Sequence, residues 1–200
     1  MSRSVPSGEF SIAAAVRQLA ELNAACIDAS SMIVCNKAGI LDDLGACCTL
    51  YSVPEVLAET GYDDAPVTLS LPDDATVTLA QTSAQTSAQP LAPPTDLQPG
   101  NRPPADLLST ELAPDDRLLH AALRARLPLI SEDRELLLRF GESGLPYFNA
   151  LMMLEYLLLR GRLSPRDYPQ AARLLRRASR YNAEVLAFAQ GVHIEILKRR

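Results

Sequence analysis

The stretch that indicates the fold of this chain is residues 24–34, AACIDASSMIV. Its first four residues form a short apolar run that ends at Asp28, which is the pattern of a buried strand. Residues 30–38 then predict a helix, and Gly39 ends it because glycine adopts left-handed backbone angles at little cost. The stretch therefore predicts a strand followed by a helix, with an acidic residue where the strand ends.

Similar units follow along the rest of the chain. We expect further strands at 47–53, 76–79, 128–130 and 146–148, and helices at 9–23, 54–60, 114–126, 133–140, 149–160, 165–178 and 182–197. Short buried strands that alternate with helices are typical of a parallel sheet covered on both faces. The predicted fold class is α/β, a three-layer α/β/α arrangement with a central, mostly parallel sheet of about five short strands plus C-terminal helices.

One segment breaks this alternation. Residues 81–110 contain a tandem QTSA and many prolines and lack a periodic apolar face, so we expect a disordered surface insertion. Neither side of the insertion has enough predicted strands for a sheet of its own. We therefore expect a single domain over residues 24–200, interrupted at 81–110 and preceded by an N-terminal helical extension over residues 1–23.

The composition excludes several classes of protein. Hydrophobic residues make up 48% of the 200 positions and charged residues 22%, which excludes a wholly disordered chain. No apolar run is long enough to span a membrane, and the first residues lack the pattern of a secretory signal, so we expect a cytoplasmic protein without a membrane partner. The four cysteines lack the spacing of a structural zinc site.

Charge is distributed unevenly along the chain. The formal net charge is −5, yet residues 151–200 hold ten basic and four acidic side chains. Such an end suits an anionic partner, RNA or an acidic protein. Solvated helix faces explain the same pattern, and charge alone does not separate the two interpretations.

Acidic residues stand where predicted strands end or helices begin. Asp28 and Asp133 directly follow strands, Asp116 begins a helix, and Glu59 lies one helical turn after Glu55. Because the carboxyl ends of parallel strands meet at one edge of a sheet, these carboxylates are expected to converge there. Converging carboxylates repel one another unless a cation is bound, and oxygen ligands suit Mg²⁺ or Mn²⁺. Taken singly, each acid also fits a helix cap or a surface charge.

Four short motifs follow one another along the chain. The motifs are Ile27-Asp28-Ala29-Ser30-Ser31-Met32-Ile33, Val53-Pro54-Glu55-Val56-Leu57-Ala58-Glu59, Asp116-Arg117-Leu118-Leu119-His120-Ala121-Ala122 and Leu129-Ile130-Ser131-Glu132-Asp133-Arg134. In this order they resemble the motifs of PIN-like domains, and together with the C-terminal part they resemble an uncharacterised prokaryotic branch of that family. The tail from Gly144 to Leu163 and from Tyr181 to Ala187 is similar to the same branch. The resemblance covers roughly residues 25–195 without the insertion.

The resemblance implies a metal-dependent endoribonuclease. The family's acids correspond to Asp28, Glu59, Asp116 and Asp133, with Ser131 as a polar helper in place of the commoner threonine. These carboxylates would hold one or two Mg²⁺ or Mn²⁺ ions, which activate a water for attack on an RNA phosphodiester. Family members include homodimers and toxins that an antitoxin partner silences. The alternative is a non-catalytic PIN-like module that binds RNA or protein.

Overall fold

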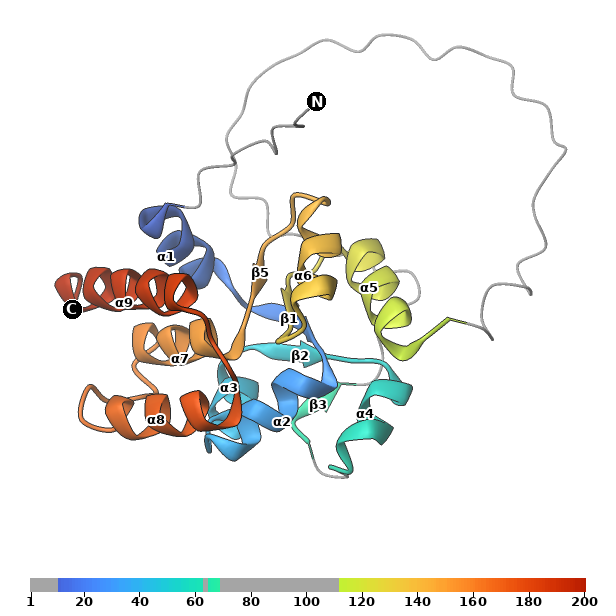
Figure 1. The fold of residues 1–200 in the computed structure, drawn as a ribbon, viewed down its shortest axis with the longest axis horizontal. Coiled ribbons are helices and arrows are strands. Elements are labelled where there is room, and N and C mark those ends of the chain that lie inside the picture. The colour runs from blue at the N-terminus through green and yellow to red at the C-terminus, as the bar shows by residue number, and fades with distance from the viewer. Residues whose placement is uncertain (1–10, 63–64, 69–111) are drawn as a thin grey trace, which may run out of the picture.

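The computed structural model describes residues 11–62, 65–68 and 112–200 of the chain. Over these residues, short strands alternate with helices before the chain ends in three consecutive helices (Figure 1). The elements are α1 Ile12–Glu21, β1 Ala24–Ile27, α2 Ala29–Lys37, α3 Leu41–Cys47, β2 Thr49–Tyr51, α4 Pro54–Thr60, β3 Val67–Thr68, α5 Pro114–Ala125, β4 Leu129–Ile130, α6 Arg134–Gly141, β5 Tyr147–Phe148, α7 Ala150–Leu159, α8 Tyr168–Ala178 and α9 Ala183–Lys198.

The five strands form one parallel sheet in the order β3-β2-β1-β4-β5. Strand β1 lies at the centre, where Cys26 pairs with Tyr51 of β2 on one side and with Leu129 of β4 on the other. Strands from before and after residues 69–111 therefore belong to the same sheet. The predicted α/β class with a central parallel sheet is confirmed.

Local sequence signals explain several element boundaries. Strand β1 covers the four apolar residues that the sequence predicts, and α4 begins at Pro54, whose fixed backbone angle suits the first helical position. Gly61 ends α4 with a φ of 65°, a left-handed conformation that glycine adopts without a steric penalty.

Two stretches differ from the sequence-based prediction. Helix α3 was not predicted, and it shortens the strand expected at 47–53 to the three residues of β2. The third strand of the sheet is β3, whereas the predicted strand at 76–79 and the insertion at 81–110 lie outside the described residues. Only two residues form β3, which is too short for an alternation pattern to reveal.

Helices cover both faces of the sheet. Helix α5 packs against α6, and α7 packs against α2 and α3 on the other side of the strands (Figure 1). Helix α4 contacts both α2 and α5. The resulting three layers place the first turns of α2, α5 and α6 at the edge of the sheet where the parallel strands end.

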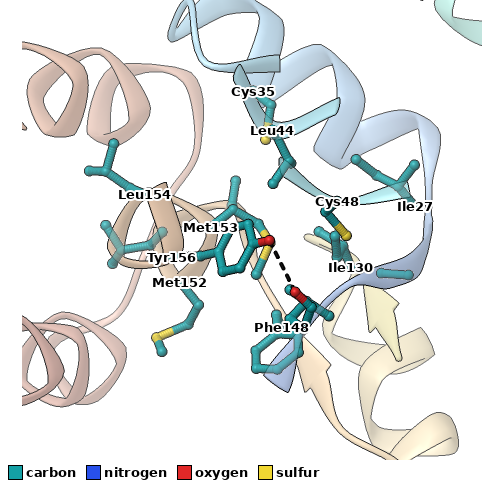
Figure 2. Close-up of a cluster of buried hydrophobic side chains, with 14 of the residues drawn as sticks. Ile27, Cys35, Leu44, Cys48, Ile130, Phe148, Met152, Met153, Leu154 and Tyr156 are labelled. Atoms are coloured by element: carbon teal, nitrogen blue, oxygen red, sulfur yellow. Dashed lines mark hydrogen bonds between the residues drawn. The ribbon is translucent and has the colours of Figure 1, made fainter. Parts of the chain in front are cut away.

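The core is centred on α7. Its residues Ala150 to Leu158 are all buried, and Figure 2 shows Met153 and Tyr156 among side chains from the sheet and from α2. The Tyr156 hydroxyl hydrogen-bonds the carbonyl oxygens of Leu22 and Cys47, at 3.0 and 2.9 Å, which ties α7 to the chain before β1 and to the end of α3. Although α7 is buried on nearly every side, no helix in the described residues is long and apolar enough to cross a membrane.

The N-terminal helix packs on this body. Ala15, Val16 and Leu19 of α1 are buried in the same core, and α1 lies against α9 and α7. Helix α1 approaches α9 closely at Gly191, where a side chain would not fit, because an added Cβ would lie 2.4 Å from the Cδ1 atom of Ile12. The predicted N-terminal extension thus contributes core side chains where the structure describes it.

Candidate functional site

The strand order places a topological switch point between β1 and β4. The chain leaves β1 toward β2 and β3 and then returns to β4 on the other side of β1. In open parallel sheets, the two loops that follow such neighbouring strands diverge and leave a crevice where ligands bind. Asp28 follows β1 directly, and Ser131 and Asp133 follow β4, so these three residues lie at the switch point.

Asp28 is held by a dense set of hydrogen bonds. Only 3% of this residue is exposed. Its Oδ1 accepts from the backbone N–H of Ser31 at 2.7 Å, as the N-cap of α2, and its Oδ2 accepts from the hydroxyls of Ser30, at 2.8 Å, and Ser131. A carboxylate with donors on both oxygens keeps a fixed orientation.

Asp133 caps the helix that follows β4. Its Oδ1 accepts from the backbone N–H groups of Glu135, at 2.7 Å, and Leu136, at 3.2 Å, at the start of α6. Its own N–H donates to the Ser131 hydroxyl at 2.9 Å, while that hydroxyl donates to Asp28. Ser131 therefore links the two acidic positions that follow the central strands, and both acids have the helix-cap geometry that the sequence left as an alternative.

A fifth acidic residue, Asp115, is influenced by the charges of the four acidic residues that the sequence singled out. Partial burial raises the pKa of its carboxyl group, and the charges of Asp28, Glu59, Asp133 and Asp116 raise this pKa further. Such repulsion acts only over short distances in a solvated protein. Asp28, Glu59 and Asp133 therefore lie close enough to Asp115 for their charges to act on its carboxyl group. We call Asp28, Glu59, Asp115 and Asp133 the acidic cluster.

Asp116, the residue that the sequence assigned to this group, has a different principal partner. Its Oδ1 accepts a hydrogen bond from Arg139 of α6 at 2.5 Å, and this contact raises the pKa of the Arg139 guanidinium. Glu55 is similarly paired with Arg117. Glu59, one turn further along α4, is exposed. Asp115 precedes Asp116 in the first turn of α5, and no local sequence pattern distinguishes the two residues.

Glu132 is a second residue that the sequence did not reveal. Its Oε1 accepts from the backbone N–H of Ala150 at 2.7 Å, and its Oε2 accepts from the Ser179 hydroxyl at 2.5 Å. Burial raises the pKa of this carboxyl group although both hydrogen bonds lower it. Glu132 stands between Ser131 and Asp133, so it fastens the loop after β4 to the start of α7 and the end of α8.

The donor types fit a magnesium or manganese ion, but the cluster is not a closed cage. Within residues 11–62, 65–68 and 112–200, no three side chains among His, Cys, Asp and Glu are grouped closely enough to hold a metal ion. Mg²⁺ typically keeps several waters and binds one or two protein carboxylates, so it does not need a closed cage. An all-oxygen cluster beside Asp28 fits such a hydrated ion.

We compared the chain with known protein families, curated proteins and solved structures. No family model matches the chain, and neither the search of curated proteins nor the search of solved structures found a match.

Proposed function

We propose that the protein is a cytoplasmic, divalent-metal-dependent endoribonuclease of the PIN-like type. The observation that carries the proposal is that Asp28 and Asp133, which follow the two strands beside the switch point, are linked through the Ser131 hydroxyl. The charges of Asp28, Glu59 and Asp133 also raise the pKa of Asp115. Repelling carboxylates destabilise a fold, and proteins retain such clusters mainly at functional sites. Four family-like motifs and the α/β/α fold support the same assignment.

Each residue has a defined part in this proposal. Asp28 and Asp133 are the direct metal ligands, Asp115 takes the place that the family resemblance gives to Asp116, and Glu59 acts through water. Bound Mg²⁺ or Mn²⁺ would supply an activated water and stabilise the charge that develops on the phosphodiester. Ser131 positions the Asp28 carboxylate with its hydrogen bond, and the donors on both Asp28 oxygens keep that carboxylate oriented before a cation binds.

The same carboxylates oppose RNA in the absence of a cation. A polyanion that approaches the acidic cluster is repelled by its charges. Entry of RNA into the acidic cluster, and cleavage there, are therefore expected to require the divalent ion.

A non-catalytic interaction module is the second candidate. It is favoured by one specific observation, that Asp28 and Asp133 already serve as helix N-caps, which gives each a structural role without any ligand. Such a module would keep its RNA or protein partner after the charge of Asp28 is removed, whereas an enzyme would lose cleavage.

The test is RNA cleavage by matched variants. Wild type is incubated with single-stranded RNA in Mn²⁺, in Mg²⁺ and in EDTA, beside Asp28→Asn and the control Glu142→Gln. Glu142 is exposed at the C-terminal end of α6, opposite the end that carries Asp133, so its variant removes one charge away from the cluster. We expect metal-dependent cleavage in wild type and control and none in Asp28→Asn. Equal cleavage in all three proteins, or none in wild type, contradicts the proposal.

The toxin interpretation is tested in the same way in cells. If an antitoxin normally silences the protein, its expression alone should arrest growth, and Asp133→Asn should restore growth. Harmless overexpression of a protein that is active in vitro would exclude a toxin role while leaving the nuclease assignment intact.

A further inference from the structure

Helix α8 has a solvent face built from arginines. Ala171, Ala172 and Leu175 are buried against the body of the protein. On the opposite side of the helix, Arg173, Arg176 and Arg177 are exposed, and the exposed Arg180 follows the helix end. No acidic residue occurs between Tyr168 and Tyr181. We call these four arginines the α8 arginine face.

The charges of this face are not neutralised within the described part of the chain. Arg117, Arg139 and Arg199 each pair with a carboxylate. No residue of the arginine face has such a pair among the residues that the structure describes.

Helix stability does not account for the whole face. Arg176 and Arg177 lie in the last turn of α8, where basic groups favour the helix dipole. Arg173 lies one turn earlier, where it is spaced three and four residues from them, and like charges at this spacing destabilise a helix. A functional partner with negative charge explains all of these positions together.

The C-terminal end of α8 contacts the loop that follows β4. Ser179, at the C-terminal end of α8, donates its hydroxyl hydrogen bond to Glu132, which stands between Ser131 and Asp133 in sequence. Helix α8 also packs against α2, whose N-cap is Asp28. In Figure 1, the C-terminal end of α8 lies next to α2. The C-terminal end of the arginine face is thus joined, through Ser179 and Glu132, to the loop that carries Ser131 and Asp133.

We propose that the α8 arginine face binds the phosphates of single-stranded RNA and directs the strand toward the acidic cluster. This inference rests on the proposed function, because it assigns the substrate path to the same site. Guanidinium groups match phosphate oxygens with two parallel hydrogen bonds, and all four positions are arginine, not lysine. A single strand suits the site, because its backbone can bend from one helix face toward the end of the sheet.

The test separates binding from cleavage. A short fluorescein-labelled single-stranded RNA is titrated with protein in EDTA, and anisotropy is measured over roughly 50 to 200 mM KCl. The test variant replaces Arg173, Arg176 and Arg177 with glutamine, which keeps helix propensity and removes three charges. The control replaces the exposed Arg17, Lys37 and Lys198, on α1, α2 and α9, with glutamine. Both variants have the same net charge.

We expect the test variant to bind at least about tenfold more weakly than wild type at low salt, with the log–log salt slope smaller by about 2, since each phosphate contact to a single strand contributes about 0.7. The control should keep nearly the wild-type affinity and slope. Replacing the same three arginines with lysine should restore most of the slope and less of the affinity, because charge returns without the two-bond geometry.

Other outcomes overturn the inference. Equal losses of RNA affinity in both variants would show an effect of net charge alone. Absence of RNA binding by wild type would show that the arginine face is not an RNA-binding surface. Displacement of RNA by poly-glutamate at an equal charge concentration would assign the face to an acidic protein partner. Cleavage in Mn²⁺ is scored separately. If the test variant binds RNA as well as wild type and still cleaves it, the role of the arginine face is refuted and the nuclease proposal stands. If wild type binds RNA through the arginines but does not cleave it, the role of the arginine face stands and the nuclease proposal is refuted.

Discussion

Replacing Asp28 by asparagine or by alanine separates its structural role from its charge. Alanine removes the α2 N-cap, which costs about 1 kcal/mol. It also leaves the buried Ser131 hydroxyl without its acceptor, which costs about 1–3 kcal/mol. Together, Asp28→Ala should lower the free energy of unfolding by about 2–4 kcal/mol.

Asparagine is expected to behave differently. It caps helices as well as aspartate does, and its side-chain oxygen can keep the contact to the Ser31 N–H. Its NH₂ group then faces the Ser30 and Ser131 hydroxyls, which lose their acceptor, so the cost should be about 1–2 kcal/mol, below that of alanine because the helix cap remains. Loss of the Asp28 charge also relieves the repulsion that raises the pKa of Asp115, which offsets part of this cost.

The assay is urea denaturation of wild type and both variants at neutral pH, in EDTA and again in Mn²⁺. Wild type should be stabilised by saturating Mn²⁺, by about 2.7 kcal/mol at a metal concentration of about 100 times Kd, and neither variant should respond. If Asp28→Asn is as unstable as Asp28→Ala in EDTA, the charge itself holds the fold and our reasoning is wrong.

Three further predictions concern other residues. Asp115→Asn should weaken Mn²⁺ binding at least about tenfold by calorimetry. Asp116→Asn loses only a solvent-exposed ion pair and should bind Mn²⁺ within about twofold of wild type. The reverse order would assign the metal to Asp116 and not to Asp115. Tyr156→Phe should cost about 1–3 kcal/mol in urea denaturation, because two backbone carbonyls lose the hydroxyl that bonds them, and a cost below about 0.5 kcal/mol would show that water replaces it. Burial holds the pKa of Glu155 above its ordinary 4.5, so the folded state keeps this proton after the unfolded chain has lost it. The free energy of unfolding should therefore decline as pH rises from 4.5 toward neutrality, and Glu155→Gln should flatten that decline; identical pH profiles would contradict this.

Sequence patterns predicted the parts of the fold that local signals determine. The apolar run before Asp28 defines β1, and Pro54 and Gly61 mark the two ends of α4. Helix α3 carries no side-chain N-cap hydrogen bond, so its start has no such signal in the sequence. Strand β3 owes its place to pairing with β2, a contact that a single short segment does not reveal.

In the candidate site too, some features follow from local sequence signals and others from contacts between residues that are distant in sequence. Asp28 and Asp133 were predicted to lie near one another because parallel strands end at a common edge, and Ser131 links them. The pairing of Asp116 with Arg139, which is 23 residues away, could not be predicted from a local pattern. Glu132 is oriented by Ser179, 47 residues away, so no local pattern could assign its role.

The most direct test of the central claim is calorimetric titration of Mn²⁺ into wild type and into the Asp28→Asn, Asp133→Asn double variant. Both asparagines can keep their helix caps, so circular dichroism should show a folded variant. Saturable binding to wild type that the double variant loses would place both carboxylates in one metal site. Absence of binding to wild type at millimolar Mn²⁺, or equal binding to both proteins, would contradict the account and leave the acids as caps and surface charges.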